Sequence, residues 1–134
     1  LRQATTRESD PRQRLAALAD AFLRFGLDYP ACYRLMFMQR PDFLLTCRAG
    51  EKEPLVTSIR QIADGAVRAA MEAGALPKGD IQAMSDLLWA QAHGIISLAI
   101  HFPQFDHQRV RDAFHAVLAL WGCAWEDIDP AQSA

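Results

Sequence analysis

The stretch that decides the fold is Leu87-Leu-Trp-Ala-Gln-Ala-His-Gly-Ile-Ile-Ser-Leu-Ala-Ile100, which is apolar almost throughout. At 3.6 residues per turn, its large side chains occupy nearly the whole circumference of a helix. A helix that is apolar all round must be buried all round, and a chain of 134 residues has few places to bury it alone. We therefore expect a second copy of the chain to cover part of this segment.

Start and stop signals place this stretch in a hairpin of two long helices. Asp80 is a suitable N-cap for a helix that runs to about Ile100. Phe102-Pro-Gln-Phe105 then breaks the chain, and Asp106 caps a last helix that runs to about Cys123. Helices joined by so short a connection are antiparallel neighbours, and two such hairpins meeting about a two-fold axis form a four-helix bundle.

The last helix carries an apolar seam at intervals of three and four residues, widened by small side chains. Together with the preceding helix it has more apolar surface than one core needs, and this excess predicts a homodimer. The residues expected at the dimer interface are Leu88, Ile95, Leu98, Val110, Phe114, Val117 and Trp121.

The first half of the chain is helical as well. A helix capped by Asp10 is expected to end at Pro30, which can also open a short helix over residues 31–38. After a loop over residues 39–50, a third helix is expected from about residue 54 to residue 73. No hairpin turn of the Asn-Gly type and no sustained alternation indicates a strand. The sequence therefore predicts an all-α domain of five helices whose last two form a dimeric four-helix bundle.

Composition and charge argue against several classes of function. A net charge of -2 provides no electrostatic attraction to phosphate, so this chain by itself is not expected to bind nucleic acid. The apolar run over residues 95–100 is far too short to span a bilayer, and the N-terminus lacks the apolar region of a signal peptide. Cys32, Cys47 and Cys123 cannot all pair within the chain, so we expect reduced thiols in or near the core.

The search for catalytic and metal-binding patterns finds none. His93 and His101 are eight residues apart, as are His107 and His115, which separates each pair by about 12 Å of helical rise. That is too far to share a metal ion without a third ligand between them. No Glu-x-x-His pair, Gly-rich phosphate loop or Gly-x-Ser-x-Gly elbow is present. We expect neither an enzyme nor a bound cofactor or metal.

An aromatic and sulfur-rich set lies around Pro30. Such a stripe is more often core than ligand box, but a helix break beside large side chains tends to leave space, and buried tyrosine hydroxyls need partners. His93 leaves two interpretations open, a core histidine hydrogen-bonded to a carbonyl or side chain, or a polar contact in a pocket. The set comprises Phe22, Phe25, Tyr29, Tyr33, Met36 and Phe37.

Two motifs resemble a known family. The stretch Trp89-Ala-Gln-Ala-His93-Gly94 resembles the Trp-x-x-x-His-Gly signature of a subgroup of TetR-family C-terminal domains. The stretch Tyr29-Pro-Ala-Cys-Tyr-Arg-Leu-Met-Phe37 is similar to the His-Pro and Leu-Phe-Arg-Leu-Met-Phe segment of the same domains, with Tyr29 in place of the frequent His. Helix order and the apolar last hairpin also fit, so the resemblance covers about residues 10–124.

The resemblance implies a bacterial, cytoplasmic homodimer that senses a small lipophilic or aromatic effector as part of a transcriptional repressor, away from the membrane. Residues 1–9 would be the remnant of a connecting helix, residues 10–125 the effector-binding and dimerisation domain, and residues 126–134 a C-terminal tail. Operator DNA would be bound only through a missing N-terminal head. The effector cavity would be lined by Phe22, Phe25, Tyr29, Tyr33, Phe37, Ile59, Ile62, Trp89 and His93.

Two alternatives stay open. A helical protein-protein interaction module without a small-molecule ligand would bind a partner helix on its exposed stripe, and it would not respond to aromatic or lipophilic compounds. A small helical enzyme would need convergent titratable groups, for which His93 is the one candidate. Few charges lie near the expected cavity, and Arg24, Arg34 and Arg60 are expected on solvated helix faces.

Overall fold

The computed structural model describes residues 10–39 and 55–122, and all of the regular structure in these two ranges is helical. Five α-helices and one π-helical turn make up the described part of the chain, as the all-α prediction requires. Expectations for residues 1–9, for residues 40–50 of the loop, for residues 126–134 and for Cys47 and Cys123 lie outside the described residues. The elements are α2 (Pro11–Asp28), α3 (Pro30–Arg34), η1 (Leu35–Gln39), α5 (Leu55–Glu72), α6 (Ile81–His101) and α7 (His107–Leu120).

Three aspartates are the N-caps of the helices that they were predicted to cap. The carboxylate of Asp10 accepts a hydrogen bond from the backbone N–H of Arg12 at 3.0 Å. Asp80 Oδ1 accepts from the N–H groups of Gln82 and Ala83 at 2.8 and 3.2 Å, and Asp106 accepts from the N–H of Arg109 at 3.0 Å. Each cap satisfies backbone donors that the first turn of a helix leaves without partners.

The segment after Pro30 differs in detail from the single short helix that was expected. One α-helical turn and a half, α3, passes directly into the π-helix η1. Tyr33 of α3 is completely buried, while Leu35 at the start of η1 is about half exposed. The wider turn of a π-helix shifts the positions of the side chains that follow it, and such turns are frequent at functional sites.

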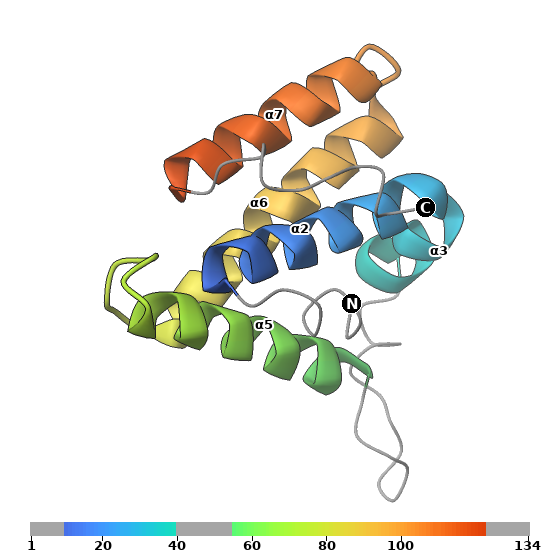
Figure 1. Cartoon of the computed structure of the whole chain (residues 1–134). Helices are drawn as coiled ribbons and strands as arrows, with labels where there is room; N and C mark the ends of the chain where they lie inside the picture. Colours follow the sequence, from blue (N-terminus) through green and yellow to red (C-terminus); the bar gives the residue numbers. More distant parts are fainter. Residues whose placement is uncertain (1–9, 40–54, 123–134) are drawn as a thin grey trace, which may run out of the picture.

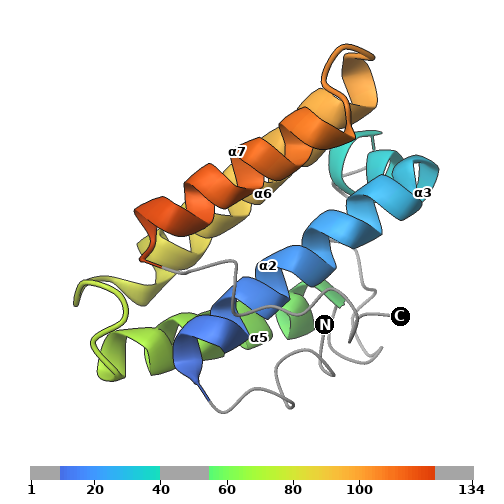
Figure 2. The ribbon, with the colours of Figure 1, turned by 45° about the horizontal axis from the view of Figure 1, so that its top comes forward.

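Helix α2 lies between the α6–α7 hairpin and α5 (Figures 1 and 2), and it packs against both α5 and α6. At Gly26 the Ile96 side chain of α6 packs so closely against α2 that a Cβ atom would lie 2.5 Å from Cγ2 of Ile96. One buried cluster surrounds Tyr33, Ile96 and Phe114, and a second joins Leu15 of α2 to α5 and to the turn before α6. Helix α2 is therefore shared by both halves of the core.

The apolar stretch of α6 is only partly covered by the chain itself. Leu87, Trp89 and Leu98 are each exposed by more than two-fifths, whereas Ile95 and Ile96 are buried.

No helix within residues 10–39 and 55–122 is long and apolar enough to cross a membrane. Cys32 is a free thiol but is exposed, which corrects the expectation that it lies in or near the core.

Candidate ligand-binding site

A cavity of about 150 Å³ lies among α2, η1, α5, α6 and α7, and its wall is almost entirely apolar. Helix α2 contributes one row of side chains to the wall, α5 and η1 contribute others, and the rest come from the α6–α7 hairpin and Trp121 after it. The wall consists of Leu15, Leu18, Ala19, Phe22, Phe37, Ile59, Arg60, Ala63, Ser85, Asp86, Leu88, Trp89, Ala92, Ile95, Phe114, Val117, Leu118 and Trp121. Apolar cavities with a few polar groups are the usual form of a small-molecule site.

The cavity takes in some of the residues predicted to line it. Phe22, Phe37, Ile59 and Trp89 are on its wall. The other predicted lining residues, Phe25, Tyr29, Tyr33, Ile62 and His93, are not among the wall residues.

The predicted residues that miss the wall have different environments. Tyr33 is buried in the neighbouring core cluster, and Phe25 packs against that cluster. Tyr29 is 60% exposed. Periodicity placed these side chains on the correct helices, but the depth at which each helix sits depends on tertiary contacts.

Aromatic rings connect the wall to this core cluster. Phe22 makes edge contacts with both Tyr33 and Phe37, each at 5.7 Å between ring centroids. Tyr33 and Phe37 are 4.7 Å apart, and Phe37 contacts the Trp89 ring at 6.4 Å. Because Phe37 belongs to η1, this network ties the π-helical turn to α2 and α6 at the edge of the cavity.

The side chains of Tyr33 and His93 form a polar pair next to the cavity, but neither residue is on its wall. The Tyr33 hydroxyl and Nδ1 of His93 are 2.6 Å apart, and the two rings stack with centroids 5.6 Å apart. Burial raises the pKa of Tyr33 and lowers the pKa of His93, so both groups are held neutral. Of the two interpretations of His93, the geometry therefore supports a core histidine with a side-chain partner.

Most of the residues predicted for the dimer interface lie in the core or on the cavity wall of the single chain. Ile95, Val110 and Phe114 are at most 7% exposed in a single chain, so they have almost no surface left for a partner. Ile95 and Phe114, together with Leu88, Val117 and Trp121, line the cavity instead. The reason is that this face of the hairpin packs towards α2, which helical periodicity alone does not determine.

Leu98 is the one predicted dimer residue that stays strongly exposed, at 42%. The seam residue Trp121 is fixed to α6 by a hydrogen bond from its indole N–H to Oε1 of Gln91 at 2.8 Å.

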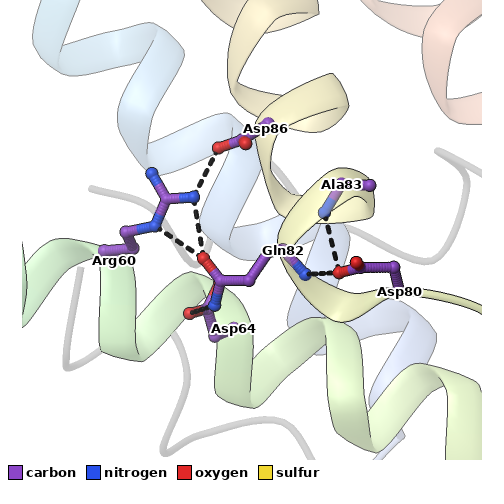
Figure 3. Close-up of polar contacts among 6 residues, drawn as sticks. All are labelled: Arg60, Asp64, Asp80, Gln82, Ala83 and Asp86. Atoms are coloured by element: carbon purple, nitrogen blue, oxygen red, sulfur yellow. Dashed lines mark hydrogen bonds and ion pairs between the residues drawn. The ribbon is translucent and has the colours of Figure 1, made fainter.

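The two charged residues of the cavity wall, Arg60 and Asp86, belong to a polar network between α5 and α6 (Figure 3). Arg60 of α5 donates from Nη2 to Oδ1 of Asp86 at 2.6 Å and to Oε1 of Gln82 at 2.8 Å. Gln82 in turn donates to Oδ2 of Asp64 at 2.6 Å. Arg60 and Asp86 are both wall residues, so Arg60, which was expected on a solvated face, reaches the cavity although its side chain remains 42% exposed.

Ser85 is a wall residue that the sequence analysis did not identify. It is only 5% exposed, and its hydroxyl has no hydrogen-bond partner within the described structure. A serine in a predicted helix carries no sequence signal of this kind, because its burial depends on how α6 packs against α2 and α5.

Within residues 10–39 and 55–122, no group of three His, Cys, Asp or Glu side chains is placed to hold a metal ion.

Neither the comparison with curated proteins nor the comparison with solved structures found a match. Residues 15–121 match the family model described as the tetracyclin repressor-like C-terminal domain. This match spans most of the chain, from Leu15 within α2 to the residue that follows α7. The chain therefore belongs to the tetracyclin repressor-like C-terminal domain family.

Proposed function

We propose that this domain is the effector-sensing and dimerising part of a TetR-type transcriptional repressor, and that it binds a small lipophilic or aromatic molecule in the cavity among α2, η1, α5, α6 and α7. Domains of this family are regulatory rather than enzymatic. The single observation that carries the proposal is the apolar cavity of about 150 Å³. Closing a space of this kind around an apolar ligand removes apolar surface from water, which favours binding.

We also assign the chain to the Trp-x-x-x-His-Gly subgroup, because each residue of the motif has a distinct place in α6. Trp89 is on the cavity wall, and His93 holds the buried Tyr33 hydroxyl. Gly94 is half-buried, and a Cβ atom added there would meet nothing within 4 Å. The three residues of the motif would then serve three parts of α6: Trp89 the cavity, His93 the core and Gly94 the outer face.

The outer face of the α6–α7 hairpin is the proposed dimer interface. Leu87, Gly94 and Leu98 recur along one face of α6, and both leucines are strongly exposed. A glycine within a helix costs about 1 kcal/mol relative to alanine, and no contact among residues 10–39 and 55–122 requires one at position 94. A partner helix crossing closely at this point would explain it, as small residues do where helices approach.

Helix α7 offers a matching stripe. Ala113, Ala116 and Leu120 are spaced by three and four residues, and Leu120 is 82% exposed. The hydrogen bond between Gln91 and Trp121 holds the end of α7 against α6 beside this face. Two copies that pair these faces would form the four-helix bundle and would bury leucines that a single chain leaves in water.

Regulation would act through α2. This helix contributes Leu15, Leu18, Ala19 and Phe22 to the cavity wall, and it begins at Pro11, after the residues 1–9 that we propose as the remnant of the connecting helix. A ligand that binds one position of α2 better than another shifts the population by its difference in affinity. A shift of α2 would change the separation of two DNA-binding heads, whose half-sites lie about 34 Å apart or a multiple of it.

A titration against a panel of aromatic and lipophilic compounds tests the proposal. Trp89 and Trp121 are both wall residues, so their fluorescence reports on occupancy. We expect Ala92→Leu, which places an isobutyl group in the cavity, to weaken binding by at least about tenfold, because space and apolar contact are both lost. Ala119→Leu is the matched control, since Ala119 is exposed near the end of α7 and is not a wall residue.

The alternative of an interaction module without a ligand gives the opposite result. Such a module needs an exposed apolar stripe but no internal cavity. If no compound of the panel binds, or if Ala92→Leu and the wild type respond alike, the proposed effector site is wrong and the interaction module is favoured.

A further inference from the structure

We propose that the cavity is built for an uncharged one-ring molecule that carries a hydroxyl group, such as a phenol, and that Ser85 is the residue that binds this hydroxyl. The inference rests on the proposed effector function and narrows the chemical class of the ligand. Three observations support it: a buried hydroxyl without a partner, the charge balance on the cavity wall, and the size of the cavity.

Ser85 is 95% buried, being 5% exposed, and its Oγ has no hydrogen-bond partner in the described part of the chain. A buried hydroxyl that has lost its water and gained no partner is unfavourable, and the great majority of buried polar atoms are satisfied. Ser85 is at the same time a wall residue of the cavity. The Oγ atom itself is covered, so a rotation about the Cα–Cβ bond would have to turn it into the cavity, where a hydroxyl group of a bound molecule would supply the missing hydrogen bond, since it both donates and accepts.

The charges on the cavity wall disfavour an anionic ligand. Arg60 is the only cation of the network, and its guanidinium is already bonded to Asp86 and Gln82. Asp86 is the other charged residue of the wall, whereas Asp64, which accepts from Gln82, is not on the wall. The cation of the wall is therefore already paired, and a carboxylate would bring further acceptors and a like charge beside Asp86.

The size of the cavity matches a one-ring apolar group. Its volume of about 150 Å³ is that of apolar protein cavities known to bind benzene. Phe22, Phe37 and Trp89 are all on the wall and present ring faces and edges to a flat aromatic guest. A single ring with a small substituent fills such a space, and its hydroxyl would have to lie at the Ser85 end.

Three ligands of matched size test the inference on the chain as described: p-cresol, p-xylene and 4-methylbenzoate, each titrated by calorimetry or tryptophan fluorescence. We expect Ser85→Ala to weaken the binding of p-cresol by roughly three- to tenfold, the size of one hydrogen bond, and to leave p-xylene unchanged. We expect 4-methylbenzoate to bind the wild type at least about tenfold more weakly than p-cresol at neutral pH, because its charge must lose its water.

The ligand-free protein provides an independent readout. Ser85→Ala removes an unsatisfied buried hydroxyl and places a better helix former in α6, so the midpoint of thermal unfolding should rise. Ser97→Ala is the matched control for helix propensity, because Ser97 is a half-buried serine of the same helix and is not a wall residue. The rise for Ser85→Ala should exceed the rise for Ser97→Ala.

The outcomes separate the two proposals. If p-cresol and p-xylene both bind but respond equally to Ser85→Ala, or if 4-methylbenzoate binds best, the assignment of Ser85 is wrong while the effector site stands. If none of the three binds, the cavity is not a site for one-ring molecules and the inference fails; the broader panel then decides whether a larger effector binds. Equal unfolding midpoints for the Ser85→Ala and Ser97→Ala variants would also contradict the inference.

Discussion

At the scale of single residues, the Tyr33–His93 pair joins α3 to α6 through a buried tyrosine. Tyr33 is fully buried, and its hydroxyl lies 2.6 Å from Nδ1 of His93. An imidazole that is kept neutral by burial can accept the phenolic proton, whereas an imidazolium can only donate. Protonation of His93 would therefore oppose both its burial and its acceptance of this hydrogen bond.

The lowered pKa of His93 predicts how stability depends on pH. Burial lowers this pKa below its ordinary value of 6.5, so on acidification the unfolded chain binds the proton first. The free energy of unfolding should fall as pH decreases below about 6.5 and level off once His93 is protonated in the folded state as well. Urea denaturation at intervals between about pH 5 and pH 8, a range that brackets the ordinary histidine pKa, measures this effect.

A substitution identifies the residue responsible. His93→Gln keeps a polar side chain but cannot titrate, so part of the pH dependence should disappear. His107→Gln, at the exposed start of α7, is the control and should keep it. A pH dependence that is unchanged in His93→Gln would mean that His93 does not contribute to it.

At the scale of elements, the crossing of α2 and α6 holds the two halves of the core together. Gly26 is buried, and the space where its Cβ atom would lie is occupied by the fully buried side chain of Ile96. A glycine inside a helix is unfavourable for the isolated helix, so the close approach of α6 is the physical reason for it here. The position of α2 in turn sets the width of the cavity.

Gly26→Ala should destabilise the protein by about 1–3 kcal/mol, because Ile96 has no free space into which it can move. Chemical denaturation measures the change. Gly65→Ala is the matched control, since Gly65 is in an exposed part of α5 and a Cβ atom there meets nothing within 4 Å. That variant should gain up to about 1 kcal/mol from helix propensity. Equal effects of the two substitutions would show that the crossing tolerates a methyl group.

At the scale of the whole molecule, the exposed face of the α6–α7 hairpin is the feature that a single chain does not explain. Leu87, Leu98 and Leu120 expose large apolar side chains, and no residue of the described part of the chain comes within 4 Å of a Cβ atom placed on Gly94. Scattered exposed leucines are ordinary, but a regular stripe on two adjacent helices is typical of a helix-helix interface.

Gly94→Leu should weaken dimerisation by at least about tenfold while leaving the monomer folded, because the added side chain projects into space that is empty in the single chain. Sedimentation at micromolar concentration measures the association, and circular dichroism checks the fold. Gly65→Leu, at an equally open helix position on α5, should sediment like the wild type. A wild-type chain that is monomeric under these conditions would refute the proposed interface.

Much of the architecture is determined by local chemistry, and the sequence therefore predicted it. Asp10, Asp80 and Asp106 cap the helices to which they were assigned, since a cap depends only on the next three residues. The breaks at Pro30 and at 102–105 were also predicted, because proline constrains its own backbone. Helix number and order follow from such signals.

What the tertiary structure decided is which face of each helix points inward. Phe114 and Ile95 were predicted for a dimer interface, yet they are core residues on the cavity wall, because α2 packs on that side of the hairpin. Ser85 carried no signal at all, since its burial and its lack of a partner exist only once three helices meet around it. Apolar periodicity marks a face as buried without saying what buries it. The neighbour of each face is fixed by contacts between residues far apart in the sequence, and these contacts form only in the folded chain.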